Sequence, residues 1–394
     1  MKKMLFAAAL SMMLVTPYCA SAEVKDPLLQ KLVDKGTLTK EEAEDIQSRT
    51  KLELPKPLQG LSIGGLAYFE YSFGETGHNN TNFNKFALTR GYINIKKDIT
   101  PWMRVRVTPD ITQLSSGDME LRMKYYYADF LPPDLGPATG NAVRVGQGHT
   151  PWLDFEESIN IYRMQGTMFQ ERAGLFSSSD FGVGVLGNIG GTLTKEQQES
   201  VGYATPYSGR YGSYHVGVYN GGGYNKAENN TNKPLEGRLT VRPLPDMIPG
   251  LQVSYFGVTG KGNSTDKPDW KVSTGFLSYQ NRYLVLTGAY TSAKGDSAGS
   301  ELDPKDKKGY SIFGDFRLPV YEKVSVFARH DNFDPDTKVT NNRQMWTMAG
   351  AGYRITGANY LVVAYERMHE QKGLAAAGKL NDDNKGQVIL QLSF

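Results

Sequence analysis

The sequence predicts an all-β fold: a transmembrane antiparallel β-barrel of 16 strands, preceded by a short N-terminal helical segment. Three observations predict this fold. Apolar and polar residues alternate within many short segments, the connections between these segments are alternately short and long, and the chain ends on the alternating stretch GQVILQLSF. Such strands can cross a bilayer without a long apolar run, because only every second side chain meets lipid.

Residues 1–22 have the features of a cleavable signal peptide. Two lysines precede the apolar run MLFAAALSMMLV, and Ala20-Ser21-Ala22 forms a cleavage site of small residues. The apolar run is too short to span a bilayer, which argues against the alternative of a membrane anchor. Cys19, the single cysteine, would leave with this segment, so we expect no disulfide in the exported chain.

The composition argues against several classes of protein. A formal net charge of +3 provides no bulk charge for binding nucleic acid. The histidines lie far apart and form no H-E-x-x-H motif, no serine lies in a G-x-S-x-G motif, and GVGVLG falls inside a predicted strand rather than before a helix. We therefore expect no enzyme activity, no metal site and no cofactor.

Residues 23–59 differ from the rest of the chain. The stretch DPLLQKLVDKGTLTKEEAEDIQSR predicts two short helices separated at Gly36, and Thr39 with Glu42 matches a capping box at the start of the second helix. A Pro-rich linker, KLELPKPLQG, follows. We interpret this segment as a small periplasmic appendage, and a self-associating helix that helps the protein to oligomerise is the alternative.

The barrel is expected to occupy residues 60–394, with an even number of strands as bacterial barrels require. The candidate strands are 60–73, 83–98, 101–112, 120–130, 141–148, 180–190, 210–220, 235–243, 249–259, 270–280, 282–293, 308–319, 322–332, 342–355, 358–369 and 385–394. Short connections such as 99–100 and 357–358 alternate with long polar ones. Outer-membrane barrels have this pattern because their periplasmic turns are tight and their external loops are long. The connection 191–209 should be a short turn and is not.

Charged and apolar residues alternate in three consecutive predicted strands, in the segments WMRVRVT, LRMKYYYA and AVRVGQ. A slip of one residue would bring the charges to the lipid, at ~2–4 kcal/mol for each Arg or Lys at the bilayer midplane. The predicted lumen-facing set is Arg104, Arg106, Arg122, Lys124 and Arg144, and Arg90 extends it from the second strand. The opposite face carries Tyr125 and Tyr127, which together with Trp102 suit the aromatic girdles at the membrane interfaces.

The C-terminal stretch predicts the strand that closes the barrel. Val388, Leu390, Leu392 and Phe394 share one face, which we expect to meet lipid, while Ile389 is an apolar exception on the other face. Both edges of this strand should pair, with the first and the fifteenth strands, so that no edge stays free. The alternative is a buried strand in a soluble sheet. The tail also resembles the C-terminal signature of bacterial outer-membrane proteins, which the barrel-assembly machinery reads.

The longest connection, about residues 149–179, is less polar than the others and contains Trp152 and Phe155 among its apolar residues. A long apolar loop rarely stands in water, so we predict that it folds into the lumen and narrows the pore. Packing on the rim or against a neighbouring subunit is the alternative. The predicted acidic side of the constriction is Asp154, Glu156 and Glu157. These acids would oppose the basic set across the pore, unless each arginine simply pairs with an acid on the next strand.

Several motifs in residues 140–225 resemble the phosphate-selective porin O/P family, and so does the layout of the whole barrel. The motifs are Gly146-Gln147, Pro151-Trp152, Asp180-Phe181-Gly182-Val183 and Asn220-Gly221. The resemblance implies a 16-stranded trimeric channel with a folded-in third loop. It does not imply phosphate selectivity, because the loop has no lysine between positions 149 and 179.

The expected function is therefore that of an outer-membrane porin, a water-filled channel for passive diffusion of ions and small polar solutes. The expected partners are outer-membrane lipid and lipopolysaccharide, the barrel-assembly machinery through the C-terminal strand, and further copies of the chain in a homotrimer. Two alternatives stay open. One is a barrel that forms a sleeve around a partner such as an electron-transfer cytochrome, and the other is an outer-membrane enzyme.

Overall fold

The computed structural model describes residues 27–49, 58–77, 81–114, 116–202, 207–371 and 382–394. They fall into two units that divide between Gln59 and Gly60. The predicted signal peptide, residues 1–22, lies outside the described residues.

The smaller unit is a pair of short helices, α2 (Pro27–Asp34) and α3 (Lys40–Arg49). The predicted capping box is confirmed: the Thr39 N–H donates to Glu42 Oε2 at 2.8 Å, and the Glu42 N–H donates to Thr39 Oγ1 at 3.1 Å. Leu29 and Ala43 are buried where the two helices pack together. Among the residues described, no helix combines the length and the apolar character that crossing a membrane requires.

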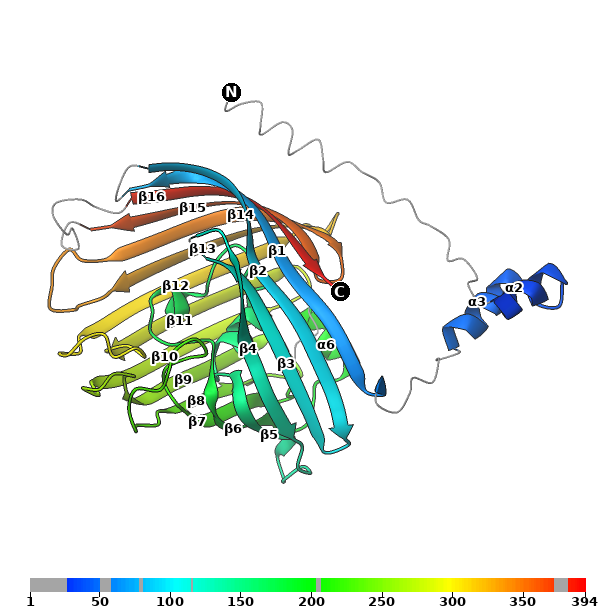
Figure 1. Cartoon of the computed structure of the whole chain (residues 1–394), viewed down its shortest axis with the longest axis horizontal. Coiled ribbons are helices and arrows are strands. Elements are labelled where there is room, and N and C mark those ends of the chain that lie inside the picture. The colour runs from blue at the N-terminus through cyan, green and yellow to red at the C-terminus, as the bar shows by residue number, and fades with distance from the viewer. Residues whose placement is uncertain (1–26, 50–57, 78–80, 115, 203–206, 372–381) are drawn as a thin grey trace. The chain divides into compact units, whose positions relative to one another are not determined.

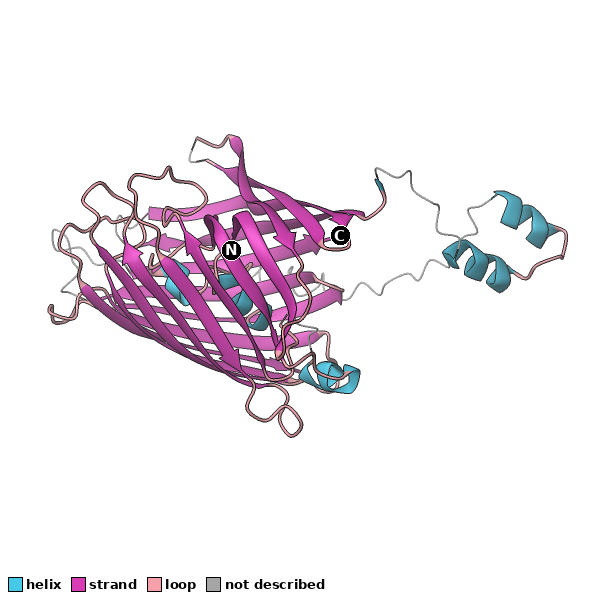
Figure 2. Cartoon of the chain, turned by 90° about the horizontal axis from the view of Figure 1, so that it is seen from below, coloured by secondary structure: helices cyan, strands magenta, loops and turns pink. Residues whose placement is uncertain are grey.

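The larger unit is a closed antiparallel barrel in which each strand pairs with its neighbours in the sequence (Figures 1 and 2). This confirms the predicted barrel of 16 strands. Its strands are β1 (Leu61–Thr76), β2 (Thr81–Thr100), β3 (Met103–Gln113), β4 (Met119–Phe130), β5 (Ala138–His149), β6 (Ser179–Ile189), β7 (Gly212–Tyr219), β8 (Leu235–Val241), β9 (Leu251–Lys261), β10 (Asp269–Gln280), β11 (Leu284–Lys294), β12 (Asp306–Arg317), β13 (Val324–Asp334), β14 (Gln344–Thr356), β15 (Asn359–Glu370) and β16 (Asp382–Ser393).

The connections give the barrel a short-turn end and a long-loop end. Turns such as 101–102 and 357–358 lie at the short-turn end, where β1 begins. The loops at the other end are named in chain order, so that L3 is residues 150–178 and L4 is residues 220–234. The connection from β6 to β7 is long although it lies at the short-turn end, because it contains the helix α6 (Lys195–Val201), which begins with a capping box at Thr194.

The last strand closes the barrel as predicted, since β16 pairs with both β1 and β15. Phe394 extends this closure with two hydrogen bonds. Its N–H donates to the Gly65 carbonyl at 3.2 Å, and its carbonyl accepts from the Gly65 N–H at 3.0 Å. Leu392 and the ring of Phe394 are exposed on the outer surface, whereas Ile389 is completely buried on the inner one. Ile389 belongs to an apolar cluster inside the barrel, which explains the exception in the alternating pattern.

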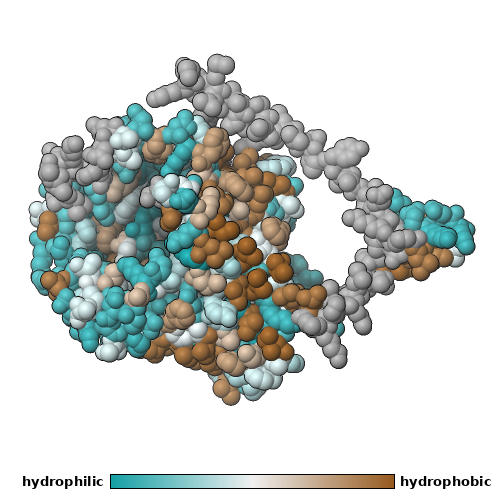
Figure 3. Space-filling view, viewed as in Figure 1, coloured by the Kyte–Doolittle hydropathy of each residue, from teal (hydrophilic) through white to brown (hydrophobic). Residues whose placement is uncertain are grey.

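The outer face of the barrel is apolar. Val183, Val185, Val216 and Val253 are exposed at alternate positions of their strands, with buried residues between them. Figure 3 shows hydrophobic residues gathering over the outer wall, while hydrophilic residues gather towards the long-loop end. This distribution suits a barrel that is surrounded by lipid at its middle.

A β-bulge in β4 makes one prediction wrong. Thr108 of β3 pairs with Tyr125 and Pro109 pairs with Met123, so Lys124 is an extra residue without a partner opposite. The extra residue reverses the alternation, and Tyr125 and Tyr127 are buried inside the barrel while Tyr126 is exposed on the outer face. Tyr125 and Tyr127 are therefore not part of an outer aromatic girdle.

The outward position of Val185 gives a test of the register. Val185→Lys places an ammonium on the apolar outer face near the middle of β6, which should destabilise the folded barrel by ~2–4 kcal/mol in lipid vesicles. Urea unfolding of the barrel in vesicles measures this cost, with Val185→Leu as the matched apolar control. Equal stability of the two variants would contradict the outward orientation of Val185.

Candidate functional site

L3 lies inside the barrel and is built around two short helices, α4 (Leu153–Ile159) and α5 (Phe169–Arg172) (Figure 2). Its apolar side chains join one buried cluster with the inner faces of strands β9 to β16. The loop residues of this cluster are Trp152, Leu153, Phe155, Ile159, Tyr162, Met164, Met168, Phe169, Leu175 and Phe176. The wall residues include Phe256, Trp270, Phe276, Phe313, Phe327, Trp346, Met348, Val362 and Ile389.

Aromatic rings make the closest contacts between L3 and the wall. The ring centroid of Trp152 lies 5.5 Å from that of Phe256 and 5.2 Å from that of Phe276. Tyr162 stacks on Phe327 of β13 with the centroids 3.8 Å apart and the planes 15° from parallel. Contacts of this kind add to the free energy gained by burying the rings, so they hold L3 against the wall.

Polar tethers from several strands hold the backbone and side chains of L3. Arg238 of β8 donates to the Pro151 carbonyl at 3.0 Å, and Arg329 of β13 donates to the Thr167 carbonyl at 2.8 Å. Arg172 of L3 forms an ion pair with Glu366 of β15, 2.5 Å between Nη1 and Oε1. Because these tethers are buried or nearly so, they are screened less by salt than a surface ion pair.

The opposite wall, β2 to β5, carries the predicted basic residues. Each of them projects inward: Arg104, Arg106, Arg122, Lys124 and Arg144, with Arg90 beside them on β2. We call this set the basic wall. Lys96, which lies outside the predicted set, pairs in register with Arg106 and faces the same side.

Wall acids neutralise part of this charge. Asp129 of β4 accepts from Arg144 at 2.8 Å and from Arg104 at 3.3 Å, and Asp110 of β3 pairs with Arg122 at 3.0 Å. The sequence left open the alternative that each arginine pairs with an acid on a neighbouring strand. Arg104, Arg122 and Arg144 do pair in this way. Arg106 instead donates to the neutral Asn94 Oδ1 at 2.7 Å.

Aromatic rings lie between the arginines of the basic wall. The guanidinium of Arg106 lies 4.7 Å from the centroid of Tyr125, and that of Arg144 lies 4.0 Å from the centroid of Tyr127. Both rings point inward because of the bulge at Lys124. The rings support the guanidinium groups by cation–π contact and so fix their orientation.

The acids of L3 do not act as one group. Asp154 accepts from the Tyr207 hydroxyl at 2.5 Å, and Glu157 accepts from Arg163 at 2.7 Å. The side chain of Glu157 keeps 32% exposure, and the charges of Arg90 and Lys124 act on it, so it lies towards the basic wall.

Glu156 differs from the expectation that it faces the basic wall. It is buried, with 6% exposure, and accepts from Trp152 Nε1 at 2.7 Å on the side of α4 that packs against the apolar cluster. Burial raises the pKa of Glu156 to about 8, with the charge of Arg329 opposing the rise. At neutral pH most Glu156 side chains are therefore protonated and carry no charge.

Of the further residues of this site, only Asp110 has a signal in the alternation of the sequence. Asp110 follows Arg104 and Arg106 at even spacing in β3, so strict alternation would have placed it beside them. Strict alternation from Arg122 would place Asp129 on the outer face. Asp129 faces inward only because the extra residue Lys124 shifts the alternation, as it does for Tyr125 and Tyr127. Tyr207, from the long connection at the short-turn end, had no such signal.

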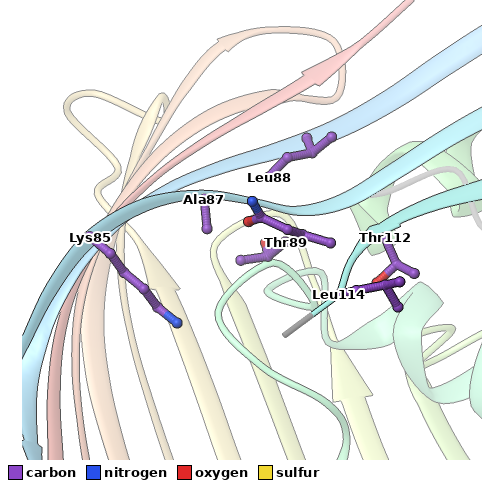
Figure 4. Close-up of a pocket in the computed structure, with 7 residues that line it drawn as sticks. Lys85, Ala87, Leu88, Thr89, Thr112 and Leu114 are labelled. Carbon is purple, nitrogen blue, oxygen red and sulfur yellow. The ribbon is translucent and has the colours of Figure 1, made fainter. Parts of the chain in front are cut away.

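A cavity of about 330 Å³ lies in the wall between β2 and β3 at the long-loop end. The pairing of these strands begins at Gly91 with Ile111, and beyond it β2 continues without β3, which leaves the gap. In Figure 4, Lys85 and Leu88 project to different sides of β2, and Thr112 lies across the gap. The cavity is away from L3, so it is not part of the site described above.

Comparison with known proteins supports the fold. No family model and no curated protein matches the sequence. The anion-selective porin from Comamonas acidovorans is similar in structure, with a TM-score of 0.59 at 11% identity, covering 85% of this chain and 99% of the porin. OmpF of Salmonella typhi, solved with daunomycin, has a TM-score of 0.56 at 10% identity, covering 85% of this chain and 97% of OmpF.

OmpT, an outer membrane protein of Vibrio cholerae solved in a trimer form, has a TM-score of 0.51 at 12% identity, covering 85% of this chain and 99% of OmpT. At these identities the likeness shows a porin-like barrel fold. In the part of the chain that the structure describes, no group of three or more His, Cys, Asp or Glu residues is arranged to hold a metal ion.

The contacts of Trp152 give a test of how L3 is held. Trp152→Ala removes the ring that touches Phe256 and Phe276, and losing a buried aromatic ring costs ~3–5 kcal/mol. We expect L3 to loosen, so that trypsin cuts the folded variant after Arg163 at a dose that leaves the unaltered protein intact. Trp102→Ala, which removes an exposed ring at the short-turn end, is the control. Fragment masses identify the cut, and equal protection of Arg163 in both variants would contradict this anchoring.

Proposed function

We propose that this protein is an outer-membrane porin, a channel for passive diffusion of ions and small polar solutes. The observation that carries the proposal is the divided interior of a closed barrel with an apolar outer face. L3 covers the inner faces of β9 to β16, while β2 to β5 keep charged side chains inward. Solutes would pass between L3 and the basic wall.

Selectivity in this proposal follows from the charges that remain unneutralised along the passage. Arg106 has no acidic partner among its hydrogen bonds in the described residues, and the side chain of Arg104 is 51% exposed. Glu157 lies on L3 within range of the charges of Arg90 and Lys124 and is partly neutralised by Arg163. A field between charges of opposite sign would favour hydrated ions and polar solutes over apolar ones.

The resemblance to the phosphate-selective porin O/P family belongs to this proposal, and the residues of its motifs make specific contacts here. Gln147 donates to the Lys124 carbonyl at 3.1 Å, just beyond Tyr126, the last residue of β4 that pairs with β5. The carboxylate of Asp180 accepts a hydrogen bond from the Gly221 N–H at the start of L4. Phosphate selectivity is not proposed, because L3 has no lysine.

The proposal includes an orientation and an assembly. The long loops would face the outside of the cell and the short turns the periplasm, where residues 23–59 would lie after removal of the signal peptide. The chain would assemble as a homotrimer, as OmpT does in the form cited above. No observation favours the sleeve or the enzyme, and the filling of the β9 to β16 side by L3 argues against a protein partner threaded through the barrel.

Conductance of the purified protein in a planar bilayer tests the function. Protein alone, without any partner, should produce stepwise increases of current, because the barrel itself contains the passage. There are two controls. One is the protein after it has been unfolded by heating, and the other is detergent solution that contains no protein. A folded barrel, verified by its shifted mobility on unheated gels, that produces no steps would contradict the proposed function.

Charge substitutions test which residues set the selectivity. Neutralising Arg104, Arg106 and Arg122 together by Gln should shift the reversal potential in a KCl gradient towards cations. At pH 7, Glu157→Gln should shift it towards anions, whereas Glu156→Gln should leave it unchanged because that group is mostly protonated. The shifts should shrink in 1 M salt, where the screening length falls to ~3 Å. An equal shift in the two glutamate variants would contradict the different environments of these acids.

A further inference from the structure

Lys124 differs from the other cations of the basic wall. Its side chain is buried, with 2% exposure, and its Nζ contacts the Ser178 hydroxyl of L3. No carboxylate lies within ion-pair distance of it in the part of the chain that is described, whereas Arg104, Arg122 and Arg144 each have one. A buried ammonium with no carboxylate in direct contact is costly, and Glu171 and Glu157 act on it only at longer range, so a group that lies against it can stabilise its charge.

The ring of Tyr224 from L4 covers this ammonium. Its centroid lies 3.9 Å from Lys124 Nζ and 5.1 Å from the guanidinium carbon of Arg122. The negative face of an aromatic ring stabilises a desolvated cation. Tyr224 also borders a cavity of about 530 Å³ formed by L3, L4 and the loop between β11 and β12. The ring therefore separates Lys124 from open space at the long-loop end.

L4 is held in this position by Asp180 at the start of β6. Asp180 Oδ2 accepts from the Gly221 N–H at 2.5 Å, and Oδ1 accepts from the Phe181 N–H at 2.7 Å. Gly223 has a φ of 77° and lies against Ser177, where a Cβ atom would come within 2.6 Å of the hydroxyl oxygen. The motifs around Asp180 and Gly221 therefore fix the backbone from which Tyr224 projects.

We propose that Tyr224 is a specificity-determining residue, whose ring shields the charge of Lys124 from ions in the passage. The inference rests on the proposed channel function and deepens it. Lys124 is then a latent anion site, and the effective basic wall consists of the arginines. Removing the ring would open the ammonium and the Ser178 hydroxyl to small anions such as chloride, and the channel would become more selective for anions.

Four variants test this in planar bilayers, by the chloride-to-potassium permeability ratio in a dilute KCl gradient. Tyr224→Ala should raise the ratio several-fold, while Tyr224→Phe, which keeps the ring, should leave it unchanged. Lys124→Met should change the ratio less with the ring present than without it, and it should cancel the increase when combined with Tyr224→Ala. An unchanged ratio in Tyr224→Ala overturns the inference, and so does an equal effect of Lys124→Met with and without the ring. Absence of any current from the unaltered protein would instead overturn the proposed function.

A second measurement does not depend on conduction or on the folding of one variant. Asp180→Asn replaces an acceptor of the Gly221 N–H by an amide, which should release L4 and uncover Lys124 with the ring still present. Acetylation of the folded protein by an amine-reactive reagent, read by mass spectrometry, should modify Lys124 faster in Tyr224→Ala and in Asp180→Asn than in the unaltered protein. Exposed Lys226 provides the internal reference. Equal rates at Lys124 in all three proteins overturn the inference.

Discussion

The packing of the apolar side chains of L3 against the inner faces of β9 to β16 is the interaction on which the rest of this structure depends. Burying one large apolar side chain is worth ~1.5–3 kcal/mol, and ten such residues of L3 lie in the cluster. A barrel interior that is polar throughout would give L3 nothing to pack against. The wall instead presents Phe256, Phe276 and Phe327 inward, at positions where a simple channel would carry polar residues.

This packing also decides what the remaining charges can do. Because L3 occupies one side of the interior, Glu157 is carried towards the basic wall while Glu156 is turned into the apolar cluster. The pairs of Arg104 and Arg144 with Asp129 hold the basic wall in place but reduce its net charge. Selectivity, in the proposed channel, depends on the few groups that these contacts leave facing water.

The sequence allowed the strands to be predicted because alternation is local. The number of strands, the pairing of β16 with β1 and β15, and the inward face of Arg104 and Arg106 all follow from a period of two. The bulge at Lys124 was not predictable in this way, because one extra residue changes the face of everything after it. The burial of Glu156 and the position of Tyr224 depend on contacts between segments far apart in the chain, which no local pattern contains.

The reactivity of introduced cysteines tests most directly whether L3 covers one side of the interior and leaves the other open. Arg104→Cys and Met348→Cys both face inward, the first on the basic wall and the second under L3. The folded barrel should react quickly with a small charged thiol reagent at position 104 and hardly at all at position 348, as measured by mass spectrometry. Equal rates of reaction at the two positions would show that L3 does not pack against the wall of β14, and would contradict this account.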